Sequence, residues 1–236
     1  MVCGLALGLA AAGPLGVQLG LPPLAGLGLF ALGGILGVFG AVWGLVTGVR
    51  HREDDPPRSR FAMASAGLAL IPVILMVRGL WHSRGFEGLD DATTDVDQPV
   101  PFHHAPSLPA NTGRDFIYDP ARGRLVARRH PELRALLLPD GPEHIYKRAL
   151  TLAQKMKTWE VVWSSPVSRT FEAIVTTRAF HFQDDVVVAV TPAPEGHSRV
   201  DVRSKSREPR GDFGINAQRV LQYLTLLRTG ERPVIQ

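Results

Sequence analysis

The sequence has little of what usually reveals covalent structure or catalytic chemistry. Its 236 residues include one cysteine, Cys3, so an internal disulfide is excluded and the chain gives no redox evidence for its compartment. It also lacks a nucleophile elbow, a phosphate-binding loop and a metallopeptidase helix motif. These absences argue against the hydrolases, nucleotide-binding proteins and zinc enzymes that are recognised by such motifs.

Charge is nearly missing from the first third of the chain. From Met1 to Trp81 there are eight charged residues, and seven of them lie within 50–60. A helix of about 20 apolar residues crosses a bilayer core, because its backbone polar groups are satisfied within the segment. Three stretches are long enough, at about 2–21, 24–49 and 61–80. We therefore predict three transmembrane helices within residues 1–82.

The position of the basic residues predicts the orientation of these helices. The loop between the second and third stretches contains Arg50, Arg52, Arg58 and Arg60, whereas the link between the first two has no charge. Positive residues favour the cytoplasmic side. We expect a multi-pass inner-membrane protein with membrane lipids as partners and with everything after Trp81 in the periplasm or otherwise outside the cytoplasm.

The remainder of the chain has nearly balanced charge. The whole sequence has a formal net charge of +4, but residues 85–236 contain 20 Lys and Arg against 19 Asp and Glu. A basic patch for nucleic acid is therefore not indicated, and we expect no nucleic-acid partner.

After the helices we expect an extended linker at 83–120, rich in Pro, Asp and Thr, and an extracytoplasmic α+β domain at 121–236. Apolar residues at helical spacing predict helices at 141–159 and 216–230. Between them, β-branched and aromatic runs separated by turn residues predict four strands. The predicted fold is a membrane-anchored α+β protein: three transmembrane helices, then a four-stranded antiparallel sheet packed by two helices. The strand runs are "WEVVWSS", "RTFEAIVTTRAF", "DVVVAVTP" and "SRVDVRSKS".

Three segments of the sequence resemble a known family. "DATTDVDQP", "TTRAFHFQDDVVVAV" and "RVDVRSKSREPRGDFGINAQRV" are similar to the family of domain of unknown function 1499. The resemblance implies a soluble domain that often follows three amino-terminal spans. It implies no established activity.

The segment 199–216 is the strongest candidate for a binding site. Alternation in a strand places Arg203, Lys205 and Arg207 on the face that points away from the core. A loop and the start of the last helix follow, and free N–H groups at a helix start favour an anion. We predict a site for an anionic small molecule, a lipid headgroup or a membrane protein partner. Its residues are Arg178, Asp185, Arg203, Lys205, Arg207, Arg210, Gly211, Asp212 and Asn216, with Asp212 or Asn216 as the helix cap.

Three alternatives remain open for these residues. In the first, carboxylates neutralise the arginines within the domain and no ligand is involved; these would be Glu172, Asp184, Asp185, Asp201 and Asp212. In the second, Arg178 and Asp185 make only a local turn. In the third, the protein is an unrecognised hydrolase that uses Asp184, Asp185 or Asp212.

We expect neither a metal nor another cofactor. Asp95, Asp97, His103 and His104 are of ligand types, but they lack a recognisable ligand spacing. A second basic run, residues 121–139, is interpreted as a segment tucked beside the core or in contact with anionic headgroups.

Overall fold

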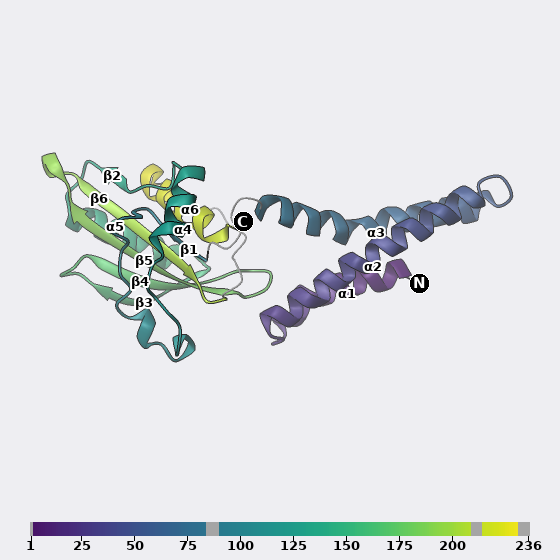
Figure 1. Cartoon of the computed structure of the whole chain (residues 1–236), viewed down its shortest axis with the longest axis horizontal. Helices are drawn as coiled ribbons and strands as arrows, with labels where there is room; N and C mark the ends of the chain where they lie inside the picture. The colour runs from purple at the N-terminus through teal and green to yellow at the C-terminus, as the bar shows by residue number, and fades with distance from the viewer. Residues whose placement is uncertain (1, 84–89, 209–213, 231–236) are drawn as a thin grey trace. The chain divides into compact units, whose positions relative to one another are not determined.

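A computed structural model describes residues 2–83, 90–208 and 214–230 of the chain. It divides into two compact units, a helical unit with α1–α3 and a sheet unit with all the described strands. Figure 1 shows the elements of each unit.

The helical unit consists of α1 (Val2–Gln18), α2 (Pro23–Arg50) and α3 (Pro56–Ser83). By length and composition, α2 and α3 qualify as membrane spans, with mean hydropathies of 2.1 and 2.0. The first predicted span ends earlier than expected: α1 has 17 residues and stops at Gln18, before a turn in which Gly20 has a φ of 103°. Among the described residues there are therefore two apolar helices of spanning length, α2 and α3, and one shorter apolar helix, α1.

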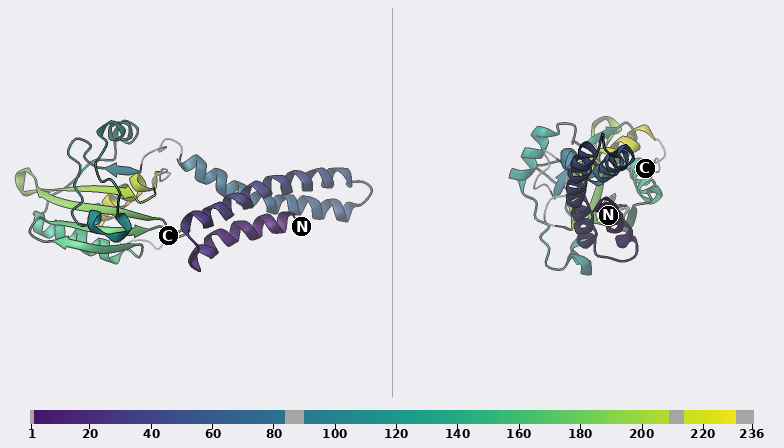
Figure 2. Two further views of the ribbon diagram at one scale, coloured as in Figure 1. Left: turned by 60° about the horizontal axis from the view of Figure 1, so that its bottom comes forward. Right: turned by 90° about the vertical axis from the view of Figure 1, so that its right-hand side faces the viewer.

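Glycines on α2 allow the other two helices to approach closely. A Cβ at Gly33 would lie 2.5 Å from the backbone N of Ala10 on α1, and one at Gly37 would lie 2.5 Å from the carbonyl O of Ala69 on α3. Such close backbone contact is typical of helix packing in membranes, where small residues form the interfaces. Figure 2 shows α2 running beside both α1 and α3.

The sheet unit contains the predicted α+β core. The expected strands are present as β3 (Trp159–Ser165), β4 (Thr170–Thr176), β5 (Gln183–Pro192) and β6 (Ser198–Ser206), and the expected helices as α5 (Pro142–Lys155) and α6 (Ile215–Thr229). One face of the sheet packs against these two helices around a core that includes Ile145, Phe171 and Tyr223. Apolar residues at period 2 in the strands meet apolar stripes of the helices, so one layered core forms.

The sheet is larger than the predicted four strands. Two three-residue strands, β1 (Asp91–Thr93) and β2 (Leu136–Leu138), both pair antiparallel with β6. The sheet thus has six strands in the order β1-β6-β5-β4-β3, with β2 also on β6. The remaining elements are α4 (Pro120–Arg129) and three short 3₁₀ helices, η1 (Ala105–Ser107), η2 (Pro109–Asn111) and η3 (Pro194–Gly196).

The segment predicted to be an extended linker has a structural role. Residues 94–118, here called the covering segment, lie against the sheet face opposite α5 and α6. Val100, Phe102 and Ala105 of this segment form a second buried cluster with Val187 of β5. Side chains that point away from the main core are therefore covered rather than exposed to solvent.

Candidate functional site

The candidate site lies where β5 begins beside the end of β6. Asp184 pairs with Ser206 and Asp185 with Lys205 in the antiparallel ladder. Consecutive residues of a strand point to opposite faces. The two neighbouring carboxylates therefore enter different environments.

Asp184 points toward α6. Its Oδ2 accepts a hydrogen bond from Arg219 Nη2 at 2.5 Å, and its Oδ1 accepts one from the Ser206 hydroxyl at 2.6 Å. The second nitrogen of Arg219, Nη1, donates to Ser204 Oγ at 2.9 Å and to Asn216 Oδ1 at 2.6 Å. The carboxylate and the guanidinium are both buried. This ion pair joins the last helix to the middle of the sheet.

Asp185 points toward the covering segment and is shared by two arginines. Arg114 Nη1 lies 2.8 Å from Asp185 Oδ2, and Arg207 Nη2 lies 2.7 Å from Asp185 Oδ1. Asn111 Nδ2 also donates to Oδ2 at 3.0 Å. Whereas Asp185 is 2% exposed in its side chain, Arg114 is 18% and Arg207 is 10% exposed. The two guanidiniums therefore reach the surface from a buried carboxylate.

Arg203 is held deeper under the covering segment. Its Nε and Nη2 donate to the two oxygens of Asp91 at 2.9 and 2.7 Å, and Nη2 also donates to the Phe116 carbonyl at 2.9 Å. The guanidinium lies 5.1 Å from the ring centre of Phe102 and 5.2 Å from that of Tyr118. With 3% of its side chain exposed, Arg203 fastens the covering segment to β6.

Tyr118 lies beside Arg203 in a partly buried position. Burial, followed by the negative charge of Asp91, raises the pKa of Tyr118 to about 12. Lys205 Nζ lies 3.1 Å from Oδ2 of the same Asp91, so Asp91 serves two cations. A bidentate arginine with a stacked ring is a geometrically specific contact.

Another carboxylate anchors the covering segment through backbone N–H donors. Glu172 of β4 is 1% exposed and accepts hydrogen bonds from the backbone N–H groups of His103, His104 and Ala105, the last at 2.6 Å. Three amide donors satisfy a carboxylate that would otherwise be costly to bury. Glu172 therefore fixes the start of η1 to the sheet.

The structure brings together only some of the predicted site residues. Asp185 and Arg207 make one ion pair, Arg203 and Lys205 share Asp91, and Asn216 contacts Arg219. Arg178 is an exposed residue between β4 and β5, and in the described part of the chain Asp185 pairs with Arg114 and Arg207 instead. Arg210, Gly211 and Asp212 lie outside the described residues.

Two details of the predicted site require correction. The cap of α6 is Gly214, in a left-handed conformation with φ 79°, and Asn216 is a buried residue within the helix. The charged row of β6 points away from the main core, as predicted, but residues 94–118 lie over it, so Arg203 and Asp201 are buried. The carboxylates proposed to neutralise the arginines do so at Asp184, Asp185 and Asp201, the last with Arg199 at 2.6 Å.

Sequence reasoning missed four members of the cluster. Asp91, Asn111 and Arg114 belong to the stretch interpreted as a linker, and Arg219 lies in an apolar stripe of α6. A signal was present for Arg219: Asn216 and Arg219 are three residues apart on one helical face, where a polar pair interrupts the stripe. The other three have no local periodicity that would mark them.

The described cluster has unequal numbers of positive and negative partners. Arg114, Arg203, Lys205, Arg207 and Arg219 share three carboxylates, those of Asp91, Asp184 and Asp185. No group of three or more His, Cys, Asp or Glu residues that would suit a metal ion occurs in the described part of the chain. Asp91 and Asp185 thus each serve two cations, whereas Arg199 is shared by two carboxylates, those of Asp95 and Asp201.

Comparison with known proteins identifies a family but not an activity. A search of curated proteins finds no match. The model of the family described as "Protein of unknown function (DUF1499)" matches residues 91–227, which include β1, the covering segment and the whole candidate site. The chain therefore belongs to the DUF1499 family.

Proposed function

We propose that the protein is a membrane-anchored binding module without catalytic activity, whose extracytoplasmic domain binds an anionic ligand. The ligand would lie at the end of the sheet where Arg114 and Arg207 meet. The observation that carries this proposal is the sharing of Asp185 by two partly exposed guanidiniums. One carboxylate balances only one of the two positive charges. Arg114 also donates to Asn111 Oδ1 and to the Ser206 carbonyl, and Arg207 to Gln183 Oε1, so a phosphate or carboxylate group at this edge would share these donors and supply the second negative charge.

We further propose that α1 is a third span and that the sheet unit lies outside the cytoplasm. With 17 residues, α1 is at the lower limit of spanning length, and its Gly13 packs on α2, where a Cβ would come within 2.4 Å of the Gly26 carbonyl. The basic loop at 50–60 supports a cytoplasmic position for that end of the helices. In this arrangement the anionic partner is a lipid headgroup, a periplasmic small molecule or a neighbouring membrane protein.

The hydrolase alternative is less well supported by the geometry. The described oxygens of Asp184 and Asp185 already accept hydrogen bonds from guanidinium, hydroxyl and amide groups. A general base needs an oxygen within reach of the proton that it removes. Binding therefore explains these carboxylates better than proton transfer does.

The test is calorimetric titration of the full-length protein in detergent with inorganic phosphate. Arg207→Gln and Arg114→Gln should each weaken binding by about tenfold to a hundredfold, since a hydrogen bond to a charged group contributes about 1.5–3 kcal/mol. The matched control is Arg228→Gln, which removes an exposed cation at the end of α6 and should bind as the wild type does. Phosphate binding that is absent, or equal in all four proteins, would contradict the proposal.

A second experiment distinguishes a lipid headgroup from a soluble anion as the ligand. The protein in nanodiscs of phosphatidylglycerol is compared with the protein in phosphatidylcholine. If a lipid headgroup fills the site, added phosphate should bind in phosphatidylcholine and be excluded in phosphatidylglycerol. Equal phosphate binding in both would assign the site to a soluble ligand.

A further inference from the structure

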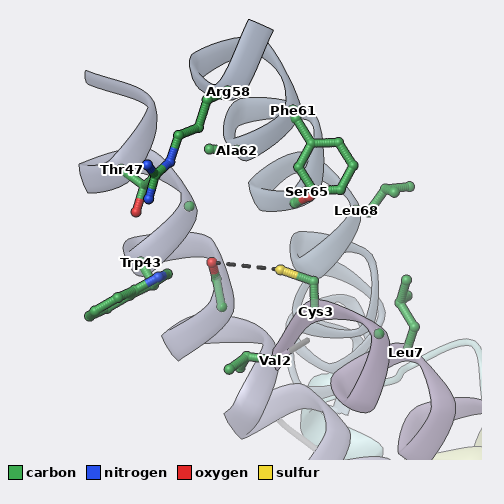
Figure 3. A pocket seen from close by; sticks show the side chains of 13 residues that line it. Val2, Cys3, Leu7, Trp43, Thr47, Arg58, Phe61, Ala62, Ser65 and Leu68 are labelled. Carbon is green, nitrogen blue, oxygen red and sulfur yellow. Dashed lines mark hydrogen bonds between the residues drawn. The ribbon is translucent and has the colours of Figure 1, made fainter. Parts of the chain in front are cut away.

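The helical unit contains a groove that the proposed function does not use. Its volume is about 520 Å³, and α1, α2 and α3 all contribute to its lining. Figure 3 shows the labelled side chains around it. A volume of this size is within the range of small-molecule sites.

The walls of the groove are apolar along most of its length. Leu7 comes from α1, Trp43 from α2, and Phe61 and Leu68 from α3. Phe61 is 76% and Trp43 73% exposed within the chain, so their outer sides face the bilayer if the helices cross it. Gly40 and Gly44 of α2 also line the groove, at positions where α2 approaches Cys3 of α1 and Ala62 of α3 closely.

One end of the groove is cationic. Arg58, in the first turns of α3, lines the groove with Thr47 of α2, and Figure 3 shows its side chain extending toward Thr47. In the described part of the chain, no carboxylate forms an ion pair with the Arg58 guanidinium. The acidic residues of the same loop are Glu53, Asp54 and Asp55, and none of them lines the groove; Asp55 accepts a hydrogen bond from the backbone N–H of Arg58.

The order of groups along the groove matches that of a phospholipid. Arg58 is beside the loop that joins α2 to α3, where a helix leaves the hydrocarbon core. Phe61, Ser65 and Leu68 follow on successive turns of α3, so the groove descends about 15 Å from the cation into the apolar region. A phosphate at Arg58 would leave an acyl chain directed along these walls.

We propose that this groove is a binding site for one anionic phospholipid, with its phosphate on Arg58 and an acyl chain against Phe61, Leu68 and Leu7. The proposal is independent of the ligand site on the sheet. It places the headgroup at the end of the helices that carries the basic loop. The specificity arises from charge complementarity, because the apolar walls alone do not distinguish one phospholipid from another.

The thiol of Cys3, the sole cysteine of the chain, can be used to measure whether a lipid occupies the groove. Cys3 lines the groove, and its Sγ lies 3.9 Å from the Gly40 carbonyl. A lipid in the groove should protect this thiol from an apolar maleimide. The rate of Cys3 alkylation is therefore measured on the full-length protein in detergent, with added phosphatidylglycerol or phosphatidylcholine, and native mass spectrometry counts the lipids retained.

The wild type should be protected at lower concentrations of phosphatidylglycerol than of phosphatidylcholine. Arg58→Gln should reduce this preference about fivefold, since a basic residue near an anionic headgroup contributes about 1 kcal/mol. Arg60→Gln is the matched control, because Arg60 is exposed in the same segment and does not line the groove. It should retain the preference.

A second pair of variants tests the groove itself. Ser65→Phe places a ring in the groove and should abolish lipid retention, whereas Ala64→Phe adds the same bulk on an exposed position of α3 outside the groove and should not. Equal protection by the two lipids, or a preference unchanged in Arg58→Gln, would overturn the proposal. Protection that rises with protein concentration and not with lipid would assign the groove to a second copy of the chain and would also overturn it.

Discussion

Arg219 of α6 and Asp184 of β5 form a buried ion pair, with Nη2 and Oδ2 2.5 Å apart. The hydroxyl of Ser206 and the amide of Asn216 complete the hydrogen bonding on either side. Because both charges are removed from water, neither tolerates the loss of its partner. The pair thereby ties the position of α6 to the sheet.

Arg219→Ala should lower the free energy of unfolding of the sheet unit by about 3–5 kcal/mol, because it leaves the Asp184 carboxylate buried without a cation. Chemical denaturation of the full-length protein in detergent, followed by tryptophan fluorescence, measures this. Glu143→Gln is the control. Glu143 pairs with Arg169, but the Glu143 side chain is 63% exposed, so this pair should contribute about 0–1 kcal/mol to the free energy of unfolding. Equal effects of the two substitutions would show that burial does not determine the strength of these pairs.

Glu172→Gln should release the covering segment. The amide that replaces one carboxylate oxygen presents N–H donors toward backbone N–H groups of residues 103–105, so charge-assisted bonds of about 1.5–3 kcal/mol are lost. Hydrogen exchange of the amides of His104 and Ala105 should accelerate, while amides of β5 stay protected. Glu160→Gln, at an exposed position of β3, should leave the pattern unchanged. Slow exchange at residues 103–105 in Glu172→Gln would contradict this role.

The three tyrosines of the chain should remain protonated in alkaline solution for as long as the protein is folded. Burial raises the pKa of Tyr146 and of Tyr223 above 10.0, and that of Tyr118 to about 12. Between pH 10 and pH 12 the unfolded chain binds fewer protons than the folded one. The contribution of the buried tyrosines to the free energy of unfolding is therefore fully present below pH 10 and decreases as the pH rises toward 12. Ultraviolet titration of phenolate absorbance checks this. Ionisation of all three tyrosines near pH 10 in the folded protein would be inconsistent with their burial.

Gly44→Leu should separate α2 from α3. A Cβ at this position would come within 2.7 Å of the Ala62 carbonyl and 2.9 Å of the Ala66 Cβ, and overpacking of this kind costs about 1–3 kcal/mol. Thermal unfolding of the protein in detergent measures the loss. Gly28→Leu is the matched change on the same helix, since nothing lies within 4 Å of a Cβ there. A Gly28 variant as unstable as the Gly44 variant would argue against glycine-mediated packing.

Much of the fold is predictable because its signals are local. The apolar stretches of α2 and α3 and the alternating residues of β6 each lie within one continuous segment, so periodicity and length suffice. The two short strands escape this reasoning. With three residues each, β1 and β2 have no measurable period, and only their pairing with β6 defines them.

The site is less predictable because its contacts are distant in sequence. Arg203 and Asp91 are 112 positions apart, and Arg114 and Asp185 are 71 apart. Alternation correctly places Arg203 and Arg207 on the face of β6 away from the main core. It does not reveal that residues 94–118 fold back over that face. Their proline-rich sequence resembles that of an extended linker and has no period that would indicate packing against a sheet.

The most direct test of the proposed function is nuclear magnetic resonance of the arginine Nε–H groups of the full-length protein during titration with inorganic phosphate. We predict saturable shifts of the Arg114 and Arg207 resonances at one common midpoint. The resonances of Arg203, which is enclosed by Asp91 and two rings, and of exposed Arg228 should stay constant. Shifts of similar size at every arginine, or none at Arg114 and Arg207, would contradict an anion site at this end of the sheet.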